Sequence, residues 1–194
     1  MKNDNSALGY WSMGQRFLKT SSLIAKEIVN SGNDILILSD KPLSEAEYDK
    51  QTKWNERNVA IPALFNFYHG IELMLKGFLS FHKENSKGHK FSQLLERLVK
   101  IIPNEDEFIN LIKSYTCDLQ ESSIVAIFNN DNSIDIDEWY QSLKYPESTK
   151  GKEYIHTNLM YAGSESLEFW ETLAKDSIEI IRLSRKYDLE NKEF

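Results

Sequence analysis

Apolar residues recur at helical spacing through the middle of this chain. Residues 60–98 read AIPALFNFYHGIELMLKGFLSFHKENSKGHKFSQLLERL. At about 100° per residue, one side of a helix collects a core stripe: Leu64, Phe67, Ile71, Leu75 and Phe78. The opposite side collects a mixed polar stripe: Pro62, Phe65, His69, Glu72, Leu73, Lys76 and Ser80. We predict a helix whose polar stripe faces solvent, a cleft or a subunit interface.

A third strip of the same helix is made of small residues. It contains Ala63, Asn66, Gly70 and Gly77. Glycine inside a helix costs roughly 0.5–1 kcal/mol relative to alanine, so two glycines on one strip need a structural reason. We predict that another helix backbone packs closely there, which would make this helix central to a bundle and contacted on two sides.

The same periodicity and the usual start and stop signals predict helices along most of the remaining chain. They comprise residues 6–30, a short helix opened by a Ser44–Glu47 capping box, residues 91–102, a helix from an Asn104–Glu107 capping box to 121, a turn at 138–143, and residues 164–188. Proline disfavours helix at the residue before it, so we expect a break near Ile61–Pro62.

Three segments lack such a pattern. Residues 129–137 are polar and predict a loop, and residues 144–163, with one proline and two glycines, predict a long connector. The run at 35–38 is either a buried strand-like linker or an added turn of helix. We therefore expect one all-α domain over residues 1–194, an antiparallel bundle of four main helices with one or two short extra helices.

The composition narrows the class of protein. The chain has 23 basic and 30 acidic residues, a net charge of −7, which argues against a broad nucleic-acid-binding surface but leaves room for a local basic pocket. The single cysteine, Cys117, cannot form an internal disulfide and is expected to be a buried thiol in a reducing compartment. No run resembles a signal peptide or a membrane span, so we expect a cytoplasmic protein with no membrane association.

Three short motifs occur in a recognisable order. Glu72-x-x-x-Lys76 lies in the apolar helix, Gly88-His89 follows at a turn, and Tyr145-Pro146 precedes the last predicted helix. This order resembles the HEPN (higher eukaryote and prokaryote nucleotide-binding) domain family. The resemblance implies a HEPN-like bundle that forms a homodimer through helix faces.

The chain departs from that family at the catalytic motif. Ribonuclease members carry an arginine, then four to six residues, then a histidine. None of the four histidines here, at 69, 82, 89 and 156, has an arginine at that distance before it. Ribonuclease activity is therefore not carried over by the resemblance.

The polar stripe is the first candidate site. His69 could exchange protons and Lys76 could hold a phosphate, with Glu72 between them. Alternatively, Glu72 and Lys76 form an ordinary pair one helical turn apart on a solvated face, which contributes roughly 0.2–0.5 kcal/mol. The resemblance keeps both interpretations open.

The turn at 87–90 is the second candidate. Lys87, His89 and Lys90 gather positive charge at a helix start, where an anion could bind. In the alternative interpretation, His89 simply caps the helix backbone. The resemblance adds Tyr145 to the candidate ligand-binding residues. No zinc spacing or phosphate-binding glycine loop is present, and we expect neither a metal nor a cofactor.

Three functional hypotheses follow. The first, which the missing arginine–histidine motif favours, is a non-catalytic HEPN-like module. It would bind a partner protein, a nucleotide or RNA in a bacterial stress, toxin–antitoxin or phage-defence system. The second is a ribonuclease with a rearranged site, in which His69 or His89 is the general acid or base and Lys76 with Arg57 or Lys90 stabilises the phosphate. The third is a purely structural helical interaction protein.

Overall fold

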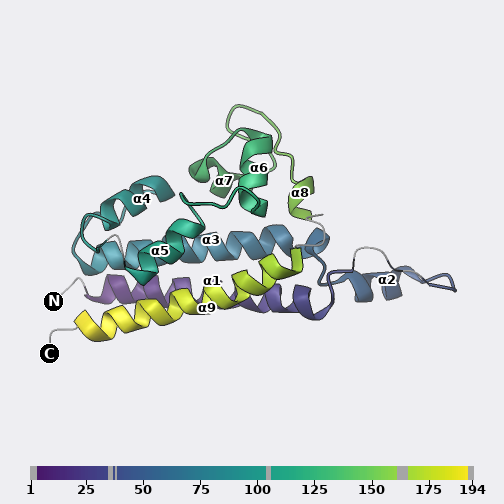
Figure 1. Cartoon of the computed structure of the whole chain (residues 1–194), viewed down its shortest axis with the longest axis horizontal. Coiled ribbons are helices and arrows are strands. Elements are labelled where there is room, and N and C mark those ends of the chain that lie inside the picture. Colours follow the sequence, from purple (N-terminus) through teal and green to yellow (C-terminus); the bar gives the residue numbers. More distant parts are fainter. Residues whose placement is uncertain (1–3, 35–36, 38, 104–105, 161–165, 192–194) are drawn as a thin grey trace.

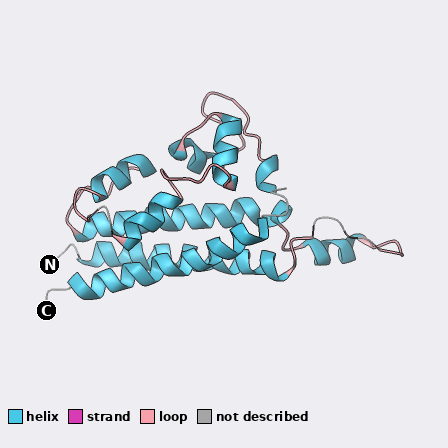
Figure 2. Ribbon diagram, in the orientation of Figure 1, coloured by secondary structure: helices cyan, strands magenta, loops and turns pink. Residues whose placement is uncertain are grey.

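The computed structural model describes residues 4–34, 37, 39–103, 106–160 and 166–191 (Figure 1). Within these residues the regular structure is helical and contains no strand (Figure 2), which confirms the all-α prediction. The helices are α1 (Asp4–Asn30), α2 (Glu45–Thr52), α3 (Glu56–Phe81), α4 (Phe91–Leu98), α5 (Glu107–Ser114), α6 (Ile124–Asn132), α7 (Ile136–Ser142), α8 (Thr157–Met160) and α9 (Ser166–Asn191).

Three long helices form the body of the molecule. In Figure 1, α1, α3 and α9 run along its long axis, and α4, α6, α7 and α8 lie on the side of α3 away from α1 and α9. The helix α5 packs against α9. The helix α2 projects from one end of the molecule. The start of α1 and the end of α9 lie together at the opposite end. The helix α3 thus lies between two layers, as expected for a central helix. None of the helices in the described residues is long and apolar enough to cross a membrane.

Both buried strips of α3 behave as predicted. Its core stripe is fully buried: Leu64, Phe67, Ile71, Leu75 and Phe78. A Cβ atom added to Gly77 would lie 2.3 Å from Cδ1 of Trp11, and one added to Gly70 would lie 2.6 Å from Cγ of Leu18. Both of these neighbours belong to α1. The glycines therefore let α1 approach α3 closely, which confirms the predicted helix contact.

The predicted break near Ile61–Pro62 is wrong. The helix α3 begins at Glu56, where the Asn55 side chain accepts a hydrogen bond from the backbone N–H of Asn58, and it continues through Pro62. The proline removes one backbone hydrogen bond, but it lies on the exposed side of the helix. Ala63 and Leu64, which follow it, are fully buried, and this packing outweighs the local preference against helix.

The predicted helix over 104–121 is wrong in extent. The described part, α5, ends at Ser114 and is capped by Asp106, whose carboxylate accepts from the N–H groups of Phe108 and Ile109. Asn104 lies outside the described residues. The chain leaves the helix after Tyr115, and Cys117 is exposed in the following turn rather than buried.

The predicted loop over 129–137 is wrong in extent, because only residues 133–135 lie between two helices. Residues 129–132 complete α6, and α7 begins at Ile136, capped by Asp135. The polarity misleads because Asn132 is buried: its side chain donates to the carbonyl of Phe128 and accepts from the N–H of Ile155. An asparagine can be buried in a packed helix when its side-chain donor and acceptor are both hydrogen-bonded. A polar residue at this position therefore does not by itself indicate a loop.

The other predicted helix boundaries agree with the observed ones to different degrees. The Ser44–Glu47 capping box opens α2 as predicted. The helix α4 ends at Leu98, four residues before the predicted end, and the connector after Lys144 contains the single-turn helix α8. Of the run at 35–38 only Ile37 is described, so that prediction lies outside the described residues.

Candidate functional site

A buried carboxylate lies at the centre of the candidate site. Glu72, in the middle of α3, is only 1% exposed. Its Oε1 lies 2.6 Å from Nζ of Lys76 and 2.7 Å from Nδ1 of His89, and its Oε2 lies 3.4 Å from Nδ1 of His69. Two of these partners come from the same helix, and His89 comes from the turn before α4. The interpretation as a solvated pair is therefore wrong, because Glu72 and Lys76 are both buried.

The helix α7 closes the site from the other side. The hydroxyl of its Tyr140 lies 2.6 Å from Nδ1 of His69. The rings of Phe17 and Phe65 lie against the imidazole, with centroids 4.4 and 5.5 Å away, and hold it in place. We call the group His69, Glu72, Lys76, His89 and Tyr140 the Glu72 cluster. Tyr140 was missed in the sequence because nothing in its local pattern relates it to a helix seventy residues earlier.

The cluster keeps Glu72 ionised. Burial alone would raise the pKa of its carboxyl group. Hydrogen bonds with His69, Lys76 and Tyr140 and the charge of Lys76 outweigh burial and hold the pKa well below its ordinary value. Burial and the nearby negative charge of Glu72 raise the pKa of the Tyr140 hydroxyl. Tyr140 therefore remains a neutral phenol that can donate a hydrogen bond.

A second ammonium group lies beside the cluster. Nζ of Lys144 is 3.5 Å from the centre of the Tyr140 ring, a cation–π contact. Its pKa is lowered because the group is partly buried and repelled by Lys76, although Glu72 partly opposes this. Among the described carboxylates, none lies within ion-pair distance of Lys144. Two ammonium groups thus share the surroundings of one carboxylate, which leaves an excess of positive charge.

The start of α4 already holds an anion from the chain itself. The carboxylate of Asp137, on α7, accepts from the backbone N–H of Ser92 at 3.1 Å and from its hydroxyl at 2.6 Å. The N-cap residue of α4 is Lys90, which makes no side-chain capping bond. His89 makes no capping hydrogen bond to α4, so that interpretation is wrong. Asp137 takes the backbone N–H of Ser92, one of the donors at this helix start, and anion binding by the turn stays a prediction.

The other predicted residues lie outside the cluster. Lys87, Lys90 and Tyr145 are exposed and make no side-chain contact with it among the described interactions. Gly88, with φ of +97°, bends the chain so that His89 can reach back to Glu72. Arg57 is exposed near the start of α3, fifteen residues before Glu72, or about 22 Å along the helix axis.

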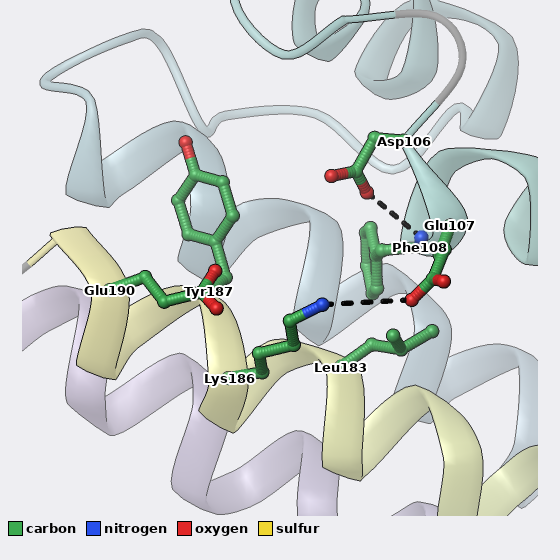
Figure 3. Close-up of a pocket in the computed structure, with 7 residues that line it drawn as sticks. All are labelled: Asp106, Glu107, Phe108, Leu183, Lys186, Tyr187 and Glu190. Carbon is green, nitrogen blue, oxygen red and sulfur yellow. Dashed lines mark hydrogen bonds and ion pairs between the residues drawn. The ribbon is translucent and has the colours of Figure 1, made fainter.

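A separate pocket of about 230 Å³ lies between the start of α5 and the end of α9 (Figure 3). Phe108 and Leu183 form its apolar side, and Lys186 lies 3.9 Å from Oε2 of Glu107 across it. Asp106 points its carboxylate at the start of α5, where it caps the helix. Its charged groups thus serve the contact between α5 and α9. Of these groups, the sequence marked Glu107, and only as part of a predicted capping box.

In the described part of the chain, no group of three or more His, Cys, Asp or Glu residues is arranged to hold a metal ion. The Lys76 ammonium, in direct contact with Glu72, provides the positive charge that this carboxylate requires. Compared with models of protein families, with curated proteins and with solved structures, the chain has no match.

Proposed function

We propose that this protein is a non-catalytic HEPN-like module that binds a phosphate-bearing ligand, a nucleotide or RNA, beside the Glu72 cluster. The proposal includes the HEPN-like arrangement of four main antiparallel helices, for which the order of the Glu72–Lys76, Gly88-His89 and Tyr145-Pro146 motifs is the support. The observation that carries it is the partly buried ammonium of Lys144, for which no described carboxylate is close enough to pair.

A phosphate would balance the charge of this region. Lys76 is neutralised by Glu72, but Lys144 adds a second positive charge whose only described contact is the Tyr140 ring. His89, with 69% of its side chain exposed, holds its Nδ1 against Glu72 and leaves the rest of its ring accessible to a ligand. Lys87 and Lys90 add positive charge to the same exposed turn, which would attract a nucleic acid to an otherwise acidic chain.

The positions of the two histidines favour binding over catalysis. Acid–base cleavage of RNA needs two groups that flank the reacting phosphate and exchange its protons. Here His69 and His89 both direct Nδ1 at the same carboxylate of Glu72, and His69 also contacts Tyr140. These contacts fix the Nδ1 side of each ring against Glu72, which suits a fixed binding surface.

The test is binding of a 5′-labelled single-stranded RNA and of ATP, measured by fluorescence anisotropy and calorimetry. Lys144→Gln should weaken binding about tenfold or more, since it removes the unpaired charge. Lys150→Gln, an exposed lysine on the same connector, is the matched control and should change affinity little. Affinity should also fall as salt is raised. The proposal fails if neither ligand binds, or if both lysine variants bind like the wild type.

A second candidate is a ribonuclease with a rearranged site. The specific observation in its favour is the contact between Oε1 of Glu72 and Nδ1 of His89, because a carboxylate that orients an imidazole leaves the other ring nitrogen free to act as acid or base. Lys76 and Lys144 would then stabilise the phosphate. Cleavage of end-labelled RNA that disappears in both His89→Ala and His69→Ala would establish this activity in place of the first proposal.

A further inference from the structure

Lys144, just after α7, is partly buried without an acidic partner. Of the described lysines, only Lys76, Lys113 and Lys144 are not exposed. Lys76 is paired with Glu72, and Lys113 has an interaction partner of its own. The described contact of the Lys144 ammonium is the face of the Tyr140 ring, with Nζ 3.5 Å from the ring centre. Lysine is rarely taken out of water without a counter-charge, so this position needs a chemical reason.

The end of α7 fixes the position of the Lys144 side chain. Its backbone N–H donates to a carbonyl group of α7 at 2.9 Å. Tyr140, one helical turn earlier, is 1% exposed, and its hydroxyl lies 2.6 Å from Nδ1 of His69. The ring of Phe91 packs edge-on against the Tyr140 ring, with centroids 5.2 Å apart. A ring held in this way gives the lysine a rigid surface, which keeps Nζ beside the Glu72 cluster.

The surroundings favour the neutral amine of Lys144. Partial burial and the charge of Lys76 lower the pKa of its ammonium group, while the charge of Glu72 opposes them. Glu72 compensates only in part, because its Oε1 already lies 2.6 Å from Nζ of Lys76 and 2.7 Å from Nδ1 of His89. The face of a phenol ring also attracts a cation, but less strongly than a carboxylate does. A larger fraction of Lys144 than of an exposed lysine therefore carries the lone pair that a nucleophile needs.

We propose that Lys144 is a modification site that small acyl phosphates acylate, and that its acylation switches off anion binding beside the Glu72 cluster. The neutral amine attacks the carbonyl carbon of the acyl phosphate and forms a C–N bond. The C–O bond to phosphate breaks, and its electron pair leaves on the phosphate. The amine releases its proton to water, so the products are an amide on Lys144 and inorganic phosphate. The loss of anion binding rests on the proposed function, whereas the reactivity of the amine does not.

Both the reagent and the product suit this position. An acyl phosphate is an anion, and Lys87 and Lys90 on the exposed turn before α4 add positive charge that attracts anions. The amide product is neutral, so it needs no counter-charge and ends the repulsion from Lys76. Lys76 itself is a poor target, because it is only 7% exposed and Glu72 holds its ammonium.

The test is competitive labelling of the full chain with a limiting amount of acetyl phosphate. Lysines that stay free are then labelled with deuterated acetic anhydride in urea, so the ratio of the two labels in each peptide gives the relative rate by mass spectrometry. Lys144 should react at least about fivefold faster than Lys150, an exposed lysine on the same connector and the internal control. Labelling in urea from the start should bring the ratio to about one, because the difference depends on the fold. A folded chain in which Lys144 reacts no faster than Lys150 would overturn the proposal.

The pH dependence of labelling is a second readout. The rate should rise with pH for every lysine as its ammonium loses a proton, and the rise for Lys144 should lie at lower pH than the rise for Lys150. The ratio of the two rates should therefore be largest at neutral pH and shrink as the pH approaches 10. A ratio that does not change with pH would contradict a neutral amine as the cause of the selectivity.

The switch is tested with acetyl-lysine incorporated at one position during expression. Acetyl-lysine in place of Lys144 should weaken binding of labelled single-stranded RNA about tenfold, since it removes one positive charge. Acetyl-lysine in place of Lys150 is the control and should bind like the wild type. RNA binding that survives acetylation at position 144 would overturn the switch. If the unmodified chain binds neither RNA nor ATP, the proposed function and the switch fail together, and selective labelling of Lys144 still identifies the reactive amine.

Discussion

The carboxylate of Glu72 lies 2.7 Å from Nδ1 of His89, although Glu72 is buried in the middle of α3 and His89 belongs to an exposed turn. This contact ties the entry of α4 to the central helix. It also makes Glu72 an acceptor for groups from two separate segments, because Lys76 reaches the same oxygen. The stability of the molecule and the position of its candidate ligand-binding groups therefore depend on one ionised side chain.

Replacing Glu72 with glutamine should lower the free energy of unfolding by about 3–5 kcal/mol. The variant leaves the Lys76 ammonium buried without a counter-charge, and His89 loses its strongest acceptor. Urea titration followed by circular dichroism measures the change. The control is Glu96→Gln, which breaks a Glu–Lys pair of the same spacing on an exposed surface and should have no measurable effect. If both variants lost the same free energy of unfolding, burial of the Glu72–Lys76 pair would have no special role in stability.

The contribution of Glu72 should also depend on pH. Its folded pKa lies below the ordinary value of 4.5, so its contribution is complete above that pH and is lost as the pH falls toward the folded value. The difference in unfolding free energy between wild type and Glu72→Gln should therefore shrink progressively below about pH 4.5. Titrations in urea at several pH values between 7 and 3 measure it. A difference that stays constant over this range would exclude an ionised Glu72 as its source.

Local periodicity was sufficient for the part of the site that lies on one helix. Positions three and four apart share a face, which placed His69, Glu72 and Lys76 together, and the glycine strip indicated the contact with α1. Periodicity shows which residues share a face of a helix but not how deeply that face is buried. It therefore left open whether the polar stripe of α3 was exposed to solvent. The burial of Glu72 follows from the later segments that cover it.

The rest of the site comes from residues that are distant in sequence. Tyr140 belongs to α7, where the sequence predicted a helical turn at 138–143. Lys144 follows α7 and begins the segment that the sequence predicted as a long connector. Asp137 caps α4 across 45 positions of sequence, a contact that no local rule can supply. Short segments have only a weak intrinsic tendency to form helix, so tertiary contacts of this kind decide whether they become helical.

The close approach of α1 to α3 gives a sharp prediction for glycine. Gly77→Ala should destabilise the protein by about 1–3 kcal/mol, because the new methyl group overlaps the rigid ring of Trp11, which Phe78 already holds edge-on. Gly9→Ala, also within a long helix, meets no atom within 4 Å and should stabilise by roughly 0.5–1 kcal/mol. Thermal unfolding of the two variants checks the opposite signs. Stabilisation by both would mean that Trp11 can move aside.

The cap of α4 by Asp137 predicts coupling between two helices that are far apart in sequence. Asp137→Ala should lower the free energy of unfolding by about 1 kcal/mol, as loss of an ordinary N-cap does. Ser92→Ala should cost less, since the backbone N–H of Ser92 still donates to the carboxylate. If the hydroxyl of Ser92 acts only through Asp137, the double variant should resemble Asp137→Ala alone, with a coupling energy of at least about 0.5 kcal/mol. Strict additivity in urea titrations would mean that the two side chains do not act on one another, and the contact between α4 and α7 would then depend on apolar packing alone.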